Sequence, residues 1–129
     1  MIIQRIRIED YTKYICRLLG YYSATWILHW SAKGKDIHEY LDDFLGELRG
    51  YTDNLMESLM GISQGKVVNS DLNPEFSDEW SENPKNLLVI IQEETIKFRE
   101  TVKCSGIQSI VDDFIGVLDK YNYLFGLCD

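Results

Sequence analysis

Four side chains that could bind a metal ion lie at helical intervals in the first half of the sequence. His38 and Asp42 are four residues apart, and Asp53 and Glu57 repeat that spacing, so each pair lies on one face of a helix. The step from Asp42 to Asp53 is close to three whole turns, which places all four side chains on one slanted stripe. Imidazole and carboxylate ligands suit iron, zinc or manganese, and the ligand set alone does not choose among these metals.

This stripe is too long for a single ion to be bound by both pairs. Asp42 and Asp53 are separated by roughly 16 Å along a helix, whereas ligand atoms must lie about 2 Å from the ion. An antiparallel copy of the helix across a two-fold axis would set the first pair of one chain opposite the second pair of the other. Gly46 and Gly50 flank the midpoint and would leave bare backbone where two helices can approach closely. If the stripe is a metal site, the spacing predicts two identical sites per dimer.

The residues around this stripe resemble the Dps family of miniature ferritins, also called DNA-binding proteins from starved cells. That family carries a His-Trp pair late in its first helix, a Lys/Arg-Gly turn, then His-Glu-x-x-Asp and, after ten more residues, Asp-x-x-x-Glu. The corresponding segments of this chain are His29-Trp30, Lys33-Gly34, His38-Glu39-Tyr40-Leu41-Asp42 and Asp53-Asn54-Leu55-Met56-Glu57.

The resemblance implies an iron-oxidising centre shared between two-fold-related subunits. The implied ligands are Asp53 and Glu57 from one subunit, with His38, Asp42 and His29 from the other. Ferrous iron, Fe²⁺, would be oxidised to Fe³⁺ by hydrogen peroxide or dioxygen at a di-iron or mono-iron site. The product would be stored in a hollow shell, in the family typically a dodecamer. Trp30 would act as an electron donor beside the site, and a packing role for it is an equal alternative.

Two alternatives remain open from the residues themselves. His29 ends the core-facing stripe expected for the first helix, where a histidine is equally well a buried core residue. The whole chain could also be a metal-free or degenerate ferritin-like bundle that acts as an oligomeric structural or interaction protein. A classical intrachain di-iron centre is not expected, because the sequence has no Glu-x-x-His motif.

Charge and composition narrow the possible partners. The chain has 129 residues with 21 acidic and 13 basic side chains, a net charge of −8, and a surface of that sign repels nucleic-acid phosphates. The opening sequence, MIIQRIRIED, also lacks the lysine-rich tail of the family, so DNA binding is not expected. Three cysteines without metal-type spacing and no signal peptide favour the cytoplasm. No apolar run approaches the ~20 residues that cross a bilayer.

The apolar periodicity predicts an all-α chain, a single ferritin-like four-helix bundle over residues 1–129. Helices are expected at about 9–31, 37–60, 84–104 and 107–125. The predicted inner stripe of the first helix is Tyr11, Ile15, Leu18, Tyr22, Trp26 and His29. That of the second is Ile37, Leu41, Phe44, Leu48, Tyr51, Leu55 and Leu59. Those of the third and fourth are Leu87, Ile91, Thr95, Phe98 and Val102, then Ile110, Val111, Phe114, Leu118, Tyr121 and Phe125.

Residues 61–83 are predicted to form a long connection, because glycine and polar residues dominate there and no helical period persists. A crossover that carries the chain along the bundle between the second and third helices would explain its length. Its expected anchors are Val67, Val68, Phe76 and Trp80.

The sequence also carries signals for helix ends. Gly34 suits a left-handed residue that ends the first helix. Asp36 with Glu39, and Ser105 with Gln108, have the spacing of capping boxes. Asn83 followed by proline predicts the start of the third helix.

Overall fold

The computed structural model describes residues 9–63 and 72–128, and those residues are helical without any strand. The elements are α1 (Glu9–Ser31), α2 (Lys35–Ser63), the short 3-10 helix η2 (Asp78–Ser81), α3 (Pro84–Thr101) and α4 (Ser105–Gly126). The predicted all-α class is therefore confirmed. Within the described residues, none of these helices combines the length and apolar character needed to cross a membrane.

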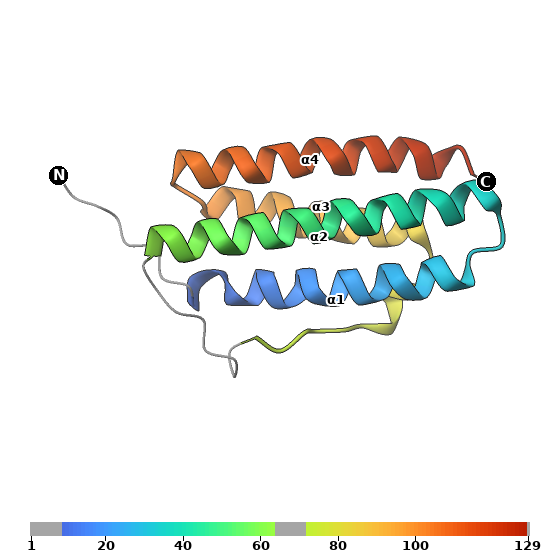
Figure 1. The fold of residues 1–129 in the computed structure, drawn as a ribbon, viewed down its shortest axis with the longest axis horizontal. Helices are drawn as coiled ribbons and strands as arrows, with labels where there is room; N and C mark the ends of the chain where they lie inside the picture. Colours follow the sequence, from blue (N-terminus) through green and yellow to red (C-terminus); the bar gives the residue numbers. More distant parts are fainter. Residues whose placement is uncertain (1–8, 64–71, 129) are drawn as a thin grey trace.

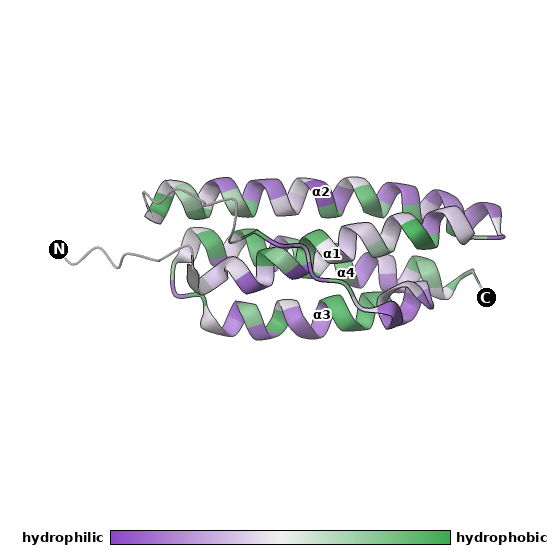
Figure 2. Cartoon of the chain, turned by 90° about the horizontal axis from the view of Figure 1, so that it is seen from below, coloured by the Kyte–Doolittle hydropathy of each residue, from purple (hydrophilic) through white to green (hydrophobic). Residues whose placement is uncertain are grey.

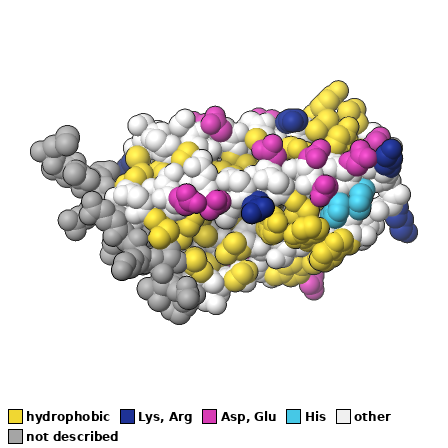
Figure 3. Space-filling model, in the orientation of Figure 1, with side chains coloured by type: hydrophobic (Ala, Val, Ile, Leu, Met, Phe, Trp, Pro, Cys, Tyr) yellow, Lys and Arg dark blue, Asp and Glu magenta, His cyan; other side chains and the backbone are white. Residues whose placement is uncertain are grey.

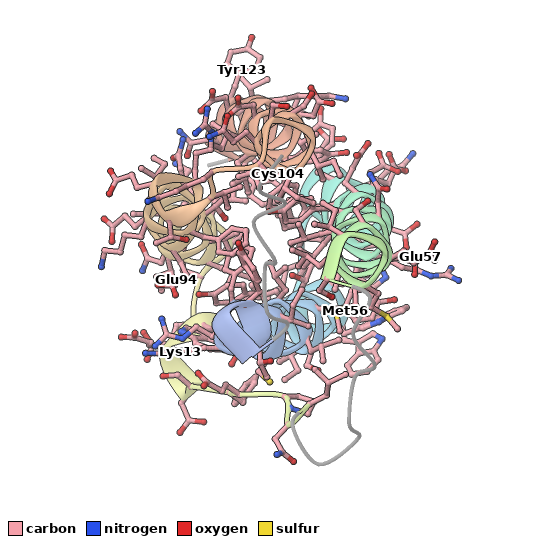
Figure 4. All side chains as sticks on the ribbon, turned by 90° about the vertical axis from the view of Figure 1, so that its left-hand side faces the viewer. Lys13, Met56, Glu57, Glu94, Cys104 and Tyr123 are labelled. Atoms are coloured by element: carbon pink, nitrogen blue, oxygen red, sulfur yellow. The ribbon has the colours of Figure 1, made fainter. Side chains whose placement is uncertain are left out.

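The four long helices pack in a square when the bundle is viewed from its end (Figure 4). The main contacts join α1 to α2 and α3, and join α4 to the same two helices, so α1 lies diagonally across from α4. The sequence colours in Figure 1 show that α1 and α4 run in one direction while α2 and α3 run in the other. α2 therefore ends, and α3 begins, at opposite ends of the bundle (Figure 1).

The described part of that connection, residues 72–83, lies alongside α1 in two perpendicular views (Figures 1 and 2). The backbone N–H of Glu75 donates to the carbonyl of Cys16 at 3.1 Å. Arg17 binds the Glu75 carboxylate at 3.1 Å and that of Glu94 on α3 at 2.8 Å. One guanidinium on α1 therefore holds both the connection and α3.

Trp80 of η2 is the expected anchor that the structure confirms. Its side chain is buried, and its ring lies 4.6 Å from that of Tyr21 on α1. Phe76 is 47% exposed, and its ring lies edge-on to the Trp80 indole with centroids 6.2 Å apart. Val67 and Val68 lie outside the described residues. Gly20 lets the connection approach, because a Cβ built there would overlap the carbonyl of Glu75.

The predicted inner stripe of α1 is wrong in its second half. Tyr22, Trp26 and His29 are only half-buried. The buried residues of α1 are Tyr11, Tyr14, Ile15, Cys16, Leu18, Tyr21, Ala24, Thr25 and Leu28. Steps of four residues advance about 40° beyond a full turn each time, so the predicted stripe drifts off the core.

The predicted stripe could leave the core-facing side because α1 is apolar on two neighbouring faces. The second face, which we call the outer stripe of α1, consists of Leu19, Tyr22, Trp26 and Trp30. Its members recur at intervals of three and four residues, as the core-facing residues do, so spacing alone cannot tell the two faces apart.

The inner stripes of the other helices agree closely with expectation. All predicted α2 residues from Leu41 to Leu59 are buried, and Leu45 joins them, while Ile37 is half-buried. Every predicted α3 residue is buried. On α4 only Ile110 is half-buried, and Ile107 takes its place in the core.

The expected capping box at the start of α2 is wrong. The helix begins at Lys35, and the first turn already contains Asp36. The backbone N–H of His38 donates to the carbonyl of Gly34 at 3.1 Å, which makes Gly34 the N-cap. Gly34 is also not in the left-handed region. The turn between α1 and α2 is therefore only three residues long, Ala32 to Gly34, and its last residue already caps the second helix.

The start of α3 follows prediction and that of α4 does not. The Asn83 side chain accepts hydrogen bonds from two backbone N–H groups in the first turn of α3. Ser105 lies inside α4, whose N-cap is Cys104, and the Gln108 side chain donates to the carbonyl of Val102 at 2.8 Å. The Gln108 side chain thus binds the carbonyl of Val102, the C-cap residue of α3, and takes no part in a capping box.

A hydroxyl network crosses the middle of the bundle. The Tyr14 hydroxyl forms hydrogen bonds of 2.8 Å with both the Tyr51 hydroxyl and the Thr95 hydroxyl. Burial raises the pKa of Tyr14 and of Tyr51 far above the ordinary tyrosine value, so both phenols stay neutral. The Tyr51 ring stacks on Phe114 at 3.8 Å. These neutral groups tie α1, α2, α3 and α4 together at one level.

Candidate metal-binding site

His29 and His38 meet across the short turn between α1 and α2. Their rings stack with centroids 3.9 Å apart and planes 22° from parallel. The Nδ1 atom of His29 lies 3.0 Å from the carbonyl oxygen of His38, and the Nδ1 atom of His38 lies 2.9 Å from that of His29. Each ring is therefore fixed by the main chain of the other helix.

These reciprocal hydrogen bonds determine the tautomer of both rings. A carbonyl oxygen can only accept, so both Nδ1 atoms must carry the proton. In the neutral imidazoles, both Nε2 atoms then keep their lone pairs. A backbone carbonyl bound to one ring nitrogen is the usual arrangement that orients the other nitrogen toward a metal ion. The histidine pair is thus prepared as a pair of Nε2 donors.

An aromatic cluster surrounds this pair on the α1 side. Trp26 touches the His29 ring edge-on, with centroids 5.7 Å apart. Trp30, 70% exposed, lies against Trp26 at 5.3 Å. Trp26 is therefore the indole in direct contact with an imidazole. Sequence reasoning assigned Trp26 to the core, although its position one turn before His29 is a signal that could have placed it at the site.

Asp53 and Glu57 form the second predicted pair, and their carboxyl groups interact. The hydrogen bond that the protonated Glu57 carboxyl donates to the Asp53 carboxylate, and next the negative charge of Asp53, raise the pKa of Glu57 above the ordinary value. Both side chains are exposed, and Figure 4 shows Glu57 pointing away from the bundle. Two neighbouring carboxylates in water repel each other, and a bound cation would relieve that repulsion. Asp42, one turn beyond His38, is also exposed.

We expect Asp53→Asn to lower the pKa of Glu57 toward 4.5, the value for an unperturbed glutamate. A carboxyl with a raised pKa in the folded protein contributes stability only below its unfolded value, and the contribution is lost as the pH rises through the folded value. The variant should therefore gain stability over the wild type as the pH increases above 4.5. Carbon-detected NMR of the Glu57 side chain and urea unfolding at several pH values measure both effects. An unchanged Glu57 titration would contradict the pairing.

A mostly apolar groove of about 450 Å³ lies between α1 and α2, next to Asp53. It is lined by Ile15, Leu19, Tyr22, Arg49, Thr52, Asp53, Met56 and Leu72. Figure 4 shows Met56 on the side of α2 that faces α1. Figure 3 shows that apolar side chains and both imidazoles gather on the same face of the molecule. We call the groove between these two helices the α1–α2 groove.

The two predicted pairs lie far apart within one chain. Among residues 9–63 and 72–128, no group of three or more His, Cys, Asp or Glu side chains is close enough to hold a metal ion. The structure therefore brings His29 to His38 and Asp53 to Glu57, and leaves those two halves separate. Sequence reasoning missed Arg49, which lines the groove beside Asp53. Its position four residues before Asp53 was the available signal.

Comparison with family models, with curated proteins and with solved structures finds no match to this chain.

Proposed function

We propose that this protein is a cytoplasmic ferroxidase of the miniature-ferritin type, built on a two-fold dimer that joins complementary half-sites. The observation that carries the proposal is the reciprocal pair of His29 and His38, whose Nδ1 atoms are both bound to main-chain carbonyls. His29 is half-buried and His38 is exposed, and each neutral ring has an Nε2 lone pair that could bind a metal ion.

The helix directions support a ferritin-like arrangement. In such bundles the second and third helices run parallel, and a crossover returns the chain between them. Here α2 and α3 run in the same direction, and the described part of their connection follows α1 (Figure 1). The histidine pair then lies at one end of the α1–α2 face, and the pair of acids lies toward the other.

A two-fold axis near the middle of α2 would bring the halves together. In an antiparallel pairing that sets Asp42 opposite Asp53 of the second chain, His38 comes opposite Glu57. The acids would supply negative charge, and the imidazoles would supply neutral donors. A divalent cation would replace the proton shared in the hydrogen bond between Glu57 and Asp53, and would offset the repulsion of their negative charges.

Iron is the substrate in this proposal. Two ferrous ions give one electron each to hydrogen peroxide, which takes up two protons and becomes two water molecules. The residues of this chain would hold the ions and keep both Nε2 lone pairs in place. Where only one ferrous ion is bound, Trp26 or Trp30 would supply the second electron that peroxide needs. Shells of such dimers would store the ferric product. The acidic surface makes DNA an unfavourable partner.

The test is an anaerobic titration with ferrous iron, followed by peroxide, of the wild type and two charge-matched variants. Asp53→Asn combined with Glu57→Gln should abolish stoichiometric iron binding and reduce oxidation to the rate without protein. Asp43→Asn combined with Glu47→Gln removes the same charge and should change neither. Burial, then the charges of Asp43 and Glu47, raise the pKa of Tyr121 on α4 to about 12, so those two acids face away from the proposed site.

The outer stripe of α1 favours a second candidate, because it offers an apolar interface whether or not metal is present. In that case the protein is a metal-free oligomeric bundle. Wild-type protein that assembles but binds no ferrous iron would support this second candidate and exclude the ferroxidase.

A further inference from the structure

We propose that Trp30 of each subunit inserts into the α1–α2 groove of its partner and is the main anchor of the dimer. This inference depends on the two-fold pairing in the proposed function and specifies how the two chains recognise each other. The second copy of this chain is the occupant of the groove.

The outer stripe of α1 supports an interface at Trp30. The core already uses one face of α1, from Tyr11 to Leu28. The outer stripe ends in an indole that is 70% exposed, and Ile27 beside it is 40% exposed. A continuous apolar strip that ends in an exposed tryptophan is typical of a surface that another protein covers. Tryptophan is also among the residues most enriched at the energetic centres of interfaces.

The register of the two-fold pairing places Trp30 near the partner's groove. The stacking of His29 on His38 holds the end of α1 beside His38. The two-fold operation that sets His38 opposite the partner's Glu57 therefore also brings the end of α1 close to the partner's Glu57. The groove opens beside this part, since Asp53 and Met56 line it. Trp30 follows His29 directly in sequence, so it arrives at the groove in the pairing that completes the metal site.

Charge and space at the middle of α2 fit the same register. The pairing sets Arg49 of one chain opposite Gly46 of the other, and no atom lies within 4 Å of a Cβ built on Gly46. The Arg49 side chain can therefore cross the bare backbone of the second helix and reach Asp42, one turn away. The positive charge of Arg49 thus meets an acid of the partner at both symmetry-related positions.

The groove also suits an indole chemically. Its volume of about 450 Å³ lies in the ~300–1,000 Å³ range of pockets that enclose organic ligands. Met56 and Leu19 supply apolar walls. The Thr52 hydroxyl donates to the Leu48 carbonyl at 2.8 Å, so its oxygen can still accept a hydrogen bond from the indole N–H.

The experiment measures the dimer dissociation constant by sedimentation in the absence of iron. We expect Trp30→Ala to raise it about 30-fold or more, as for an interface hot spot. Tyr123→Ala removes another aromatic side chain, 67% exposed on α4, and should leave the constant unchanged. Circular dichroism should show unchanged folding in both variants, because both rings are exposed in the single chain. A dimer unaffected by Trp30→Ala would overturn the inference.

A double-mutant cycle locates the indole. Met56→Ala should weaken the dimer when it is the only substitution. Added to Met56→Ala, Trp30→Ala should raise the dimer dissociation constant much less than it does in the wild type, because the effects of substituting two contacting residues do not add. Full additivity would place Trp30 outside the groove and overturn the inference. Glu57→Gln, at a residue that does not line the groove, should keep the wild-type dimer while it loses iron oxidation. Failure of the anchor and failure of the ferroxidase are therefore separate results.

Discussion

Iron oxidation should return when two inactive variants are mixed. One variant carries His29→Gln with His38→Gln, and the other carries Asp53→Asn with Glu57→Gln. A hybrid dimer unites the intact acids of the first chain with the intact histidines of the second, so one of its two sites is complete. With random exchange of subunits, half of the dimers are hybrids, and about a quarter of the wild-type sites are recovered. Stopped-flow absorbance after peroxide addition measures the recovery.

The control for this mixing experiment is a chain with all four substitutions. Mixed with either inactive variant, it cannot supply the missing half-site and should restore nothing. Hybrid formation is verified by giving one chain an affinity tag and recovering the other with it. Verified hybrids without activity would rule out a site shared between subunits. Full activity of either variant alone would show that its substituted residues are not ligands.

The largest effect on stability is expected from Gly20→Ala. The added methyl group would overlap the carbonyl of Glu75 and press on the Trp80 ring, so residues 72–82 would have to move away from α1. The hydrogen bond from Glu75 to Cys16 and much of the burial of Trp80 would be lost. Full burial of a large apolar side chain is worth about 3 kcal/mol. Urea unfolding should therefore show a loss of about that size.

Gly116→Ala provides the matched control on α4. No atom lies within 4 Å of a Cβ built on Gly116, and alanine favours a helix interior over glycine by about 1 kcal/mol. The same substitution should thus stabilise at one glycine and destabilise at the other. Equal effects at the two positions would show that the close approach of the connection to α1 does not matter for stability.

The sequence was sufficient to predict the helices and the inner stripe of α2. That stripe has one apolar face bordered by charged residues, so only one rotation of the helix buries it. The same reasoning failed for α1, because Tyr22 and Trp26 continue the spacing of Leu18 while lying on a second apolar face. Amphipathic spacing identifies a face only where the alternative faces are polar.

The candidate site was predictable in its residue types and not in its local geometry. The distance between Asp42 and Asp53 follows from helix dimensions, so the separation of the two half-sites is predictable from the spacing of the residues. The stacking of His29 on His38 is not, because it depends on the path of a short turn whose first cap was expected at Asp36. The α1–α2 groove depends on Leu72 from the connection, where no helical pattern gives a position.

The bonds between His29 and His38 have a consequence for any mutational scan of this protein. Each imidazole is oriented by the peptide group of the other residue's helix, and each ring also covers the other. Removing either side chain therefore frees the survivor to rotate and to exchange its tautomer. The two residues behave as one unit, and the number of nitrogen ligands cannot be counted by substituting them singly.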